Sequence, residues 1–339
     1  MSKGRVAVPV IVALAVMIAL FFGSFMLGQY PIPPSGVVDI IGSRMFGYEC
    51  SQPDMAQTIV WKVRLPRIMA ALLIGAALSV AGAVYQGLFK NPMVSPDILG
   101  ASSGAGLGAA IAILLSLPYA FIQLNAFVFG ILAVGIAYFI CQRVSRGKDA
   151  VLMLVLGGMI VSTLFSSFIT LTKYIADPES KLPEITYWLM GGLSTVSLQD
   201  IAVLIVPLVV GALPLAAMRW RLNAMAFGDE EASAMGMNVK RLRFIFILCA
   251  TLLTAASVSV AGMIGWIGLI IPHMARFIVG PNNKVLLPMA SLVGASFLLL
   301  VDNAARLLFT VEIPLGILTS IIGAPFFFYL LIKRKREQS

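Results

Sequence analysis

Long apolar runs separated by short polar connectors fill most of this chain. A membrane-spanning helix needs about 20 predominantly apolar residues, and ten segments approach or meet that length. They cover residues 6–27, 68–89, 98–117, 121–141, 150–174, 201–218, 244–260, 264–279, 285–308 and 315–332, and the eighth is short and contains a proline. The pattern predicts an all-α polytopic membrane protein with ten transmembrane helices, forming a single transmembrane domain over residues 1–339.

The basic residues set the expected orientation. Lys3 and Arg5 precede the first apolar run, which could be a signal peptide, but no small-x-small cleavage site follows and we expect a spanning helix. Ten spans put both termini on one side, and the basic run 333–336 predicts that this side is the cytoplasm. With this topology, 17 of the 24 Lys and Arg residues fall on the inner side. We therefore expect a multi-pass membrane protein with both termini in the cytoplasm.

Composition excludes several other classes. Hydrophobic residues make up 60% of the chain and charged residues 12%, whereas soluble domains are nearer 45–50% apolar. The net charge of +9 lies in connectors beside apolar runs, so lipid headgroups explain it better than nucleic acid does. Neither the three cysteines nor the lone His273 has metal-ligand or catalytic spacing. We expect no enzyme activity, no metal site and no bound cofactor, with His273 in a structural role.

An internal repeat indicates how the helices are related. An ungapped offset of 180 residues aligns 79–82 (SVAG) with 259–262 (SVAG), and also Pro92 with Pro272. The two repeat halves span approximately residues 62–175 and 240–332, and an odd number of spans between their first helices makes the repeat inverted. Inverted repeats are typical of transporters that work by alternating access.

The connector 219–243 is the longest charged segment on the predicted inner side, and we treat it as a coupling loop. Asp229 can cap a short helix, Glu230 and Glu231 suit its positive start, and Gly236 can form a left-handed stop. So short a helix needs a packing partner. Two interpretations stay open: a capped loop resting on the membrane face, or a docking element for a cytoplasmic protein.

The energy source must be external to this chain if it is a transporter. No GxxxxGK[ST] phosphate loop occurs, and no predicted span places a charged residue near its midplane, as ion-coupled carriers usually require. In the fifth span Ser162, Ser166, Thr170 and Lys173 recur at helical spacing and would form one polar stripe. The stripe predicts either a translocation path or close helix packing. A short outer helix is expected near residues 184–189.

Three arginines on the predicted outer side are unusual. Arg64 and Arg67 flank a proline in the sequence RLPR, and Arg306 lies at the outer end of the ninth span. They could extend to lipid headgroups or pair with Asp302 or Glu312. Alternatively, they could form a basic cluster that accepts acidic groups of a soluble partner, because arginine pairs with carboxylates in a directional, bidentate manner.

Five motifs resemble the FecCD-type permeases, the ten-helix, vitamin B12 permease-like membrane subunits of ABC importers for iron-siderophores, haem and vitamin B12. The motifs are RLPR at 64–67, GAALSVAGAVYQGLFKNPMVSPDILG at 75–100, GDEEASAMGM at 228–237, GWIGLIIPHMAR at 265–276 and EIPLGILTSIIGAPFF at 312–327. The resemblance implies a homodimer in a prokaryotic plasma (inner) membrane, with two cytoplasmic ATPase subunits that bind ATP and magnesium, and one soluble substrate-binding protein.

The resemblance also implies residue roles. The ATPase-coupling helix would be formed by Gly228, Asp229, Glu230, Glu231, Ala232 and Gly236. Arg64, Arg67 and Arg306 would receive the binding protein, Asn91 and Met93 would form the inner gate, and the fifth helix would line the path. The connector 146–150 lacks the Ser/Thr cluster of the vitamin B12 branch. The resemblance therefore does not extend to the second layer of the gate, and it favours the vitamin B12 cargo less.

Three hypotheses follow for function. The first is the permease of an ABC importer for an iron chelate, with a ferric siderophore as the first choice of cargo and haem or cobalamin as alternatives. The second is an ion-driven secondary transporter, which the inverted repeat alone would permit. The third, a channel or structural membrane protein, has little support in the sequence.

Overall fold

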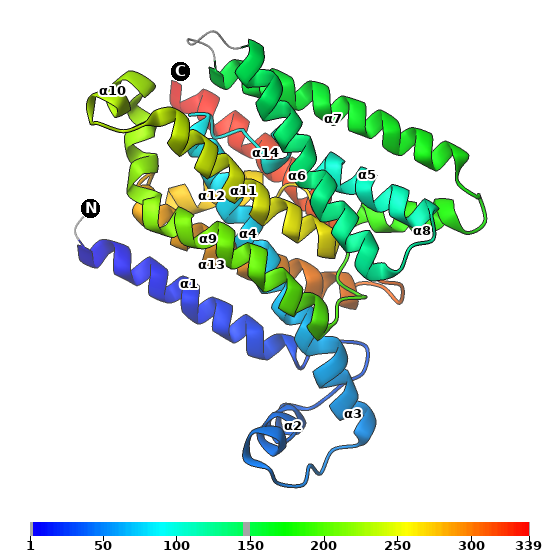
Figure 1. The fold of residues 1–339 in the computed structure, drawn as a ribbon. Coiled ribbons are helices and arrows are strands. Elements are labelled where there is room, and N and C mark those ends of the chain that lie inside the picture. Colours follow the sequence, from blue (N-terminus) through cyan, green and yellow to red (C-terminus); the bar gives the residue numbers. More distant parts are fainter. Residues whose placement is uncertain (1–2, 145–149, 339) are drawn as a thin grey trace.

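The computed structural model of the protein describes residues 3–144 and 150–338, and every regular element in these ranges is a helix (Figure 1). Hydrophobic side chains interrupted by Gly, Pro and polar turns define where the helices begin and end. The elements are α1 (Lys3–Ser24), α2 (Pro34–Phe46), α3 (Asp54–Thr58), η1 (Ile59–Arg64), α4 (Leu65–Leu88), η2 (Pro96–Leu99), α5 (Ala101–Leu114), α6 (Tyr119–Val144), α7 (Ala150–Ile175), α8 (Lys181–Met190), α9 (Leu198–Phe227), α10 (Asp229–Ala234), α11 (Val239–Ala261), α12 (Ile267–Val279), α13 (Asn283–Leu307) and α14 (Leu315–Gln338).

The all-α polytopic class predicted from the sequence is confirmed. Within the described ranges, seven helical segments are long and apolar enough to cross a membrane by length and composition, and three shorter apolar helices occupy the other predicted positions. Of these, α5 has 14 residues and α12 has 13, fewer than the roughly 20 that a bilayer core needs. The count of ten complete spans therefore stays a prediction.

The centre of the bundle is built on α4 and α11, whose side chains are mostly buried. Small residues let the neighbouring backbones approach closely. A Cβ added at Gly82 would lie 1.8 Å from the carbonyl oxygen of Gly268 in α12, and one at Gly75 would lie 2.3 Å from a backbone oxygen of α13. Tyr85 and Thr251 join the two central helices through a hydroxyl–hydroxyl hydrogen bond of 3.0 Å.

Helix packing shows a reciprocity between the two predicted repeat halves. Helix α4 of the first half packs against α12 and α13 of the second, and α11 of the second packs against α5 and α6 of the first. The ungapped alignment, however, is wrong beyond Gly82. That glycine lies inside α4, whereas Gly262 ends α11, and Pro92 lies in a loop while Pro272 lies inside α12. A helical repeat with different helix lengths cannot keep one fixed offset.

The two ends of the bundle carry different appendages (Figure 1). Helix α10 lies at the end where α1 begins and α14 ends, while α2, α3 and α8 lie at the opposite end. Helix α8 confirms the short helix expected near residues 184–189. The predicted coupling loop 219–243 is mostly helical, because α9 continues to Phe227 and α11 already begins at Val239, which leaves only residues 228–238 between them. Helices α2 and α3 were not predicted.

Candidate functional site

The α10 segment, residues 228–236, stands out from the bundle beside the ends of α9 and α11 (Figure 1). Of the α10 residues only Ala232 is buried, at 0% exposure, while Glu230 and Glu231 face outward. Gly236 takes a left-handed backbone with φ of 79°, and its amide donates to the Ser233 carbonyl at 2.9 Å. The predicted helix and its glycine stop are confirmed, and one small side chain anchors a largely polar protrusion.

The start of α10 differs from the prediction. Gly228 is the N-cap residue, no side chain caps the first turn, and Asp229 already belongs to the helix. An N-cap side chain must come from a residue with a non-helical backbone, so the Asp229 carboxylate is available for another partner. It accepts two hydrogen bonds from Arg243 Nη2, at 2.9 and 2.7 Å, and this ion pair ties α10 to the first turns of α11.

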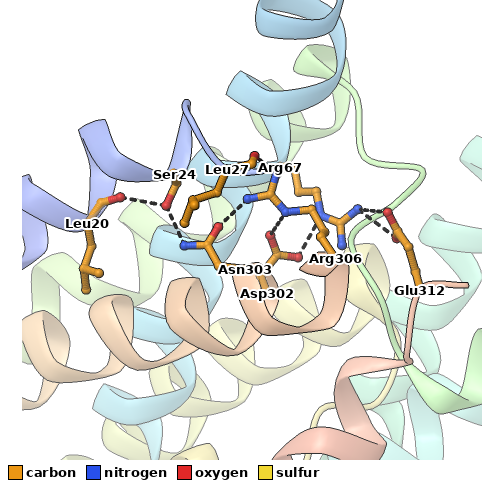
Figure 2. A network of polar contacts seen from close by, with 8 residues as sticks. All are labelled: Leu20, Ser24, Leu27, Arg67, Asp302, Asn303, Arg306 and Glu312. Atoms are coloured by element: carbon orange, nitrogen blue, oxygen red, sulfur yellow. Dashed lines mark hydrogen bonds and ion pairs between the residues drawn. The ribbon is translucent and has the colours of Figure 1, made fainter. Parts of the chain in front are cut away.

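At the opposite end, Arg67 of α4 lies between two carboxylates (Figure 2). Its Nε donates to Asp302 Oδ1 at 2.7 Å, and its Nη1 donates to both oxygens of Glu312, at 2.7 and 2.8 Å. The side chain of Asp302 is 0% exposed and that of Glu312 is 35% exposed. The contacts connect α4, α13 and the segment before α14, which are distant in sequence.

The other two arginines are also engaged within the chain. Arg306 contacts Asp302 Oδ2 through Nε at 3.4 Å and donates to the Asn303 side chain, which in turn donates to Ser24 of α1 at 2.8 Å (Figure 2). Arg64 donates to the backbone carbonyls of residues 25 and 30, after α1. Together with Arg67 they form a group that we call the outer arginine cluster, after the side of the membrane predicted for it, and every arginine in it is at most 7% exposed. The structure favours the pairing with Asp302 and Glu312 over a freely accessible basic surface.

The hydroxyl residues of α7 do not all share one environment. Ser166 and Thr170 are exposed, and Thr170 Oγ1 donates to the Ser166 carbonyl at 3.0 Å, so its donor needs no other partner. Ser162 is only partly exposed, and a Cβ at Gly100, which precedes α5, would lie 3.1 Å from its hydroxyl oxygen. The polar stripe therefore divides into an outward-facing part and one residue directed to η2 and α5.

The loop after α4, residues 89–95, carries the two predicted inner gate residues, and we call it the gate loop. Asn91 and Met93 are both exposed, and the Asn91 side-chain oxygen accepts a hydrogen bond from the Met93 amide at 2.9 Å. Sequence reasoning missed Gln86, which donates to the Val94 carbonyl at 3.2 Å. A polar amide within an apolar helix was the available signal. The predicted second gate layer, residues 146–149, lies outside the described residues.

The predicted residues thus form separate regions instead of one catalytic centre. The α10 segment and the outer arginine cluster lie at opposite ends of the bundle, and the gate loop follows the end of α4 (Figure 1). No group of three or more His, Cys, Asp or Glu side chains that could hold a metal occurs in residues 3–144 and 150–338. Apolar spans, a protruding polar helix and an exposed hydroxyl stripe define an integral membrane permease.

Comparison with known proteins identifies the family. Residues 16–333 match the model of the FecCD transport family, and the chain belongs to that family. It is 39% identical over 310 residues to the "Molybdate import system permease protein MolB" of Haemophilus influenzae, covering 91% of each chain. It is 41% identical over 277 residues to a "Probable iron chelatin transport system permease protein" of Helicobacter pylori, covering 82% of this chain and 83% of that one.

A solved structure supports the same assignment. The structure described as "An inward-facing conformation of a putative metal-chelate type ABC transporter" superposes with a TM-score of 0.85 at 37% identity, covering 96% of this chain and 98% of that one. Further relatives carry names for cobalamin and hemin import. The chain is therefore a FecCD-family transport permease, and its relatives are named for several cargos, including molybdate, which the sequence analysis did not consider.

Proposed function

We propose that this chain is the membrane-spanning subunit of an ABC importer that moves a metal chelate, most simply a ferric siderophore, from an outer binding protein into the cytoplasm. The observation that carries the proposal is the α10 segment. It projects from one end of the bundle with its acidic side chains exposed, and within the helix α10 itself only Ala232 is buried. A six-residue helix is unstable alone in water, so a rigidly anchored one on the surface suits insertion into a partner.

The partner at α10 would be a cytoplasmic ATPase subunit. The Asp229–Arg243 ion pair would transmit a displacement of α10 to α11, which packs against the central α4. Residues 228–232 and 236 are the positions assigned to this contact. With both termini on the α10 side, this end of the bundle would face the cytoplasm, as the basic tail at 333–336 predicts.

Two copies of this chain would enclose the translocation path. The exposed Ser166 and Thr170 on α7 offer hydroxyls without fixed charge, and Thr170 is internally hydrogen-bonded. Such a surface suits a hydrated path that a bulky cargo crosses without tight binding. We assign α7 to this path, with Ser162 at its junction with η2, and assign Asn91 and Met93 to the inner gate.

A soluble binding protein would dock at the opposite end, near the outer arginine cluster. The cluster holds three arginines against two carboxylates, an excess of one positive charge, which would attract acidic groups of a partner. Because other parts of this chain bury Arg64, Arg67 and Arg306, direct contact with a partner would require the surrounding segments to open.

The choice of cargo rests on the names of the related permeases. The relatives named for iron chelatin and the metal-chelate type transporter favour a metal chelate, while haem, cobalamin and molybdate are the alternatives that other relatives' names suggest. All four are compatible with a path lacking fixed charge near its centre.

The test is reconstitution of the chain in liposomes with a candidate ATPase subunit and a candidate substrate-binding protein from the same organism. Uptake of ⁵⁵Fe-ferrichrome, hemin, cyanocobalamin and molybdate would be measured with and without ATP. We expect ATP-dependent uptake of one of these, strongest for the iron chelate. Uptake driven by a proton or sodium gradient without the ATPase would instead establish a secondary transporter and refute the proposal.

A further inference from the structure

Gln86 lies at the last turn of α4, 2% exposed, where the chain leaves the helix for the gate loop. Its side-chain amide reaches two separate elements. Nε2 donates to the Val94 carbonyl of the gate loop at 3.2 Å and to the Leu269 carbonyl of α12 at 3.1 Å. A single buried amide therefore links the far end of the gate loop to a helix of the other repeat half.

Proline explains why one of the two α12 carbonyls near Gln86, that of Gly268, lacks a helical donor. Pro272 has no backbone N–H, so the carbonyl four residues earlier, that of Gly268, loses its helical donor. The Gln86 amide nitrogen lies 3.5 Å from that Gly268 oxygen and closer to the next carbonyl. A buried carbonyl without a donor is costly, and Gln86 therefore has a structural reason to hold this position.

Arg276 fixes which way the Gln86 amide points. Its Nη1 donates to Gln86 Oε1 at 2.5 Å. A guanidinium group can only donate, so the oxygen must face Arg276 and the NH₂ group must face Val94 and α12. Arg276 takes part in none of the salt bridges between described residues, which leaves its partly buried side chain with this orienting contact.

We propose that Gln86 and Arg276 are positioning residues that hold the gate loop against α12 and so set the position of Asn91 and Met93. This inference rests on the proposed function only in that the importer assignment makes this loop the inner gate. The backbone hydrogen bonds of the gate loop are local: the Val94 amide donates to the Asn91 carbonyl at 3.3 Å and the Asn91 amide to the Gln86 carbonyl at 3.2 Å. Apolar packing adds to them, because Val94 is 3% exposed and Pro96, just after the loop, lies against Gly268 of α12. The Gln86 side chain adds a hydrogen-bonded link from the loop to the second repeat half.

The experiment is hydrogen–deuterium exchange on the full chain in lipid nanodiscs. Gln86→Glu keeps the contact with Arg276, now as an ion pair, but a carboxylate cannot donate to Val94 or Leu269 and repels both carbonyls. We expect exchange of the gate-loop amides of residues 91, 93 and 94 to rise by roughly tenfold, the factor that one lost hydrogen bond produces. The matched control is Gln142→Glu, at an exposed glutamine whose amide donates to the Tyr138 hydroxyl, and it should leave the loop unchanged.

Arg276 variants give an independent arm if Gln86→Glu does not fold. Arg276→Met removes the group that orients the amide and should raise gate-loop exchange several-fold, whereas Arg276→Lys keeps a donor and should stay near the wild type. Equal exchange in Arg276→Met and Arg276→Lys, or a rise spread evenly over α4 and α12 instead of the loop, would overturn the positioning role. Neither result affects the importer assignment, which fails only if the reconstituted wild-type chain shows no ATP-dependent uptake.

Discussion

Asp302 is the side chain on which the outer arginine cluster depends most. It is fully buried and contacts Arg67 at 2.7 Å and Arg306 at 3.4 Å. Replacing it with leucine, Asp302→Leu, would leave Arg306 without a carboxylate and Arg67 with Glu312 alone. Removing one partner of a buried ion pair costs about 3–5 kcal/mol, because the other charge stays buried without compensation. Since Arg67 keeps Glu312 as a partner, we expect the free energy of unfolding to fall by about 3 kcal/mol, near the lower end of this range.

Two companion variants separate the ion pair from general damage. Glu312→Gln alters the more exposed carboxylate, 35% exposed, and should cost about 1 kcal/mol or less because solvent screens such pairs. The double variant Arg67→Met with Asp302→Leu removes both charges of the closest pair. It should lose less free energy of unfolding than the sum of the two single variants.

The assay is equilibrium unfolding by sodium dodecyl sulfate in mixed micelles, followed by tryptophan fluorescence. The double-mutant cycle then gives the coupling free energy between residues 67 and 302. A coupling of at least about 1.5 kcal/mol would agree with a buried, charge-assisted contact. Additive losses, or an Asp302→Leu variant as stable as the wild type, would refute the role of this cluster in holding α4 to α13.

Other parts of the structure lead to three further expectations. Gly82→Ala places a methyl group against a backbone oxygen of α12 and should destabilise the fold by about 1–3 kcal/mol, whereas Gly135→Ala in α6 meets no atom within 4 Å and should be neutral or slightly stabilising in the same unfolding assay. Arg243→Met frees the first turn of α10, and exchange of the α10 amides should rise about fivefold, the effect of a partly exposed ion pair. The Ser51 hydroxyl, which donates to Asp39, lowers the pKa of that carboxyl below its usual range. The contact between Ser51 and Asp39 should therefore hold at neutral pH and be lost only as the pH falls through this lowered pKa, which a shift of the Ser51 amide resonance would report. A transition above the ordinary carboxyl range would contradict this expectation.

The sequence predicted those features that depend on local pattern. Apolar runs located the helices, and Gly236 located the end of α10, because only glycine adopts its left-handed backbone at no steric cost. The sequence wrongly predicted that Asp229 caps α10. The carboxylate instead accepts from Arg243, 14 residues away, and the approach of Arg243 depends on where α11 begins. Helices α2 and α3 were missed because, with 13 and 5 residues, each is too short to be recognised as a span.

The candidate site shows the same division. The sequence singled out Arg67 and named Asp302 and Glu312 as alternative partners, but it could not choose between pairing and docking. That choice depends on α13 lying beside α4, 235 residues away in the chain. The sequence did not point to Gln86 and Arg276, because their role depends on carbonyls of α12, including the Gly268 carbonyl that Pro272 leaves without a helical donor. These contacts exist only where α4 packs against α12.

The most direct test of the central claim is a photo-crosslink from α10 to the ATPase. A benzoylphenylalanine placed at Met235, 58% exposed just after α10, is compared with one at Tyr187, 52% exposed on α8 at the opposite end. Both variants are co-expressed with the candidate ATPase subunit and irradiated in native membranes. The account predicts a crosslink to the ATPase from residue 235 and none from residue 187. Failure of residue 235 to crosslink, or an equal yield from both positions, would contradict it.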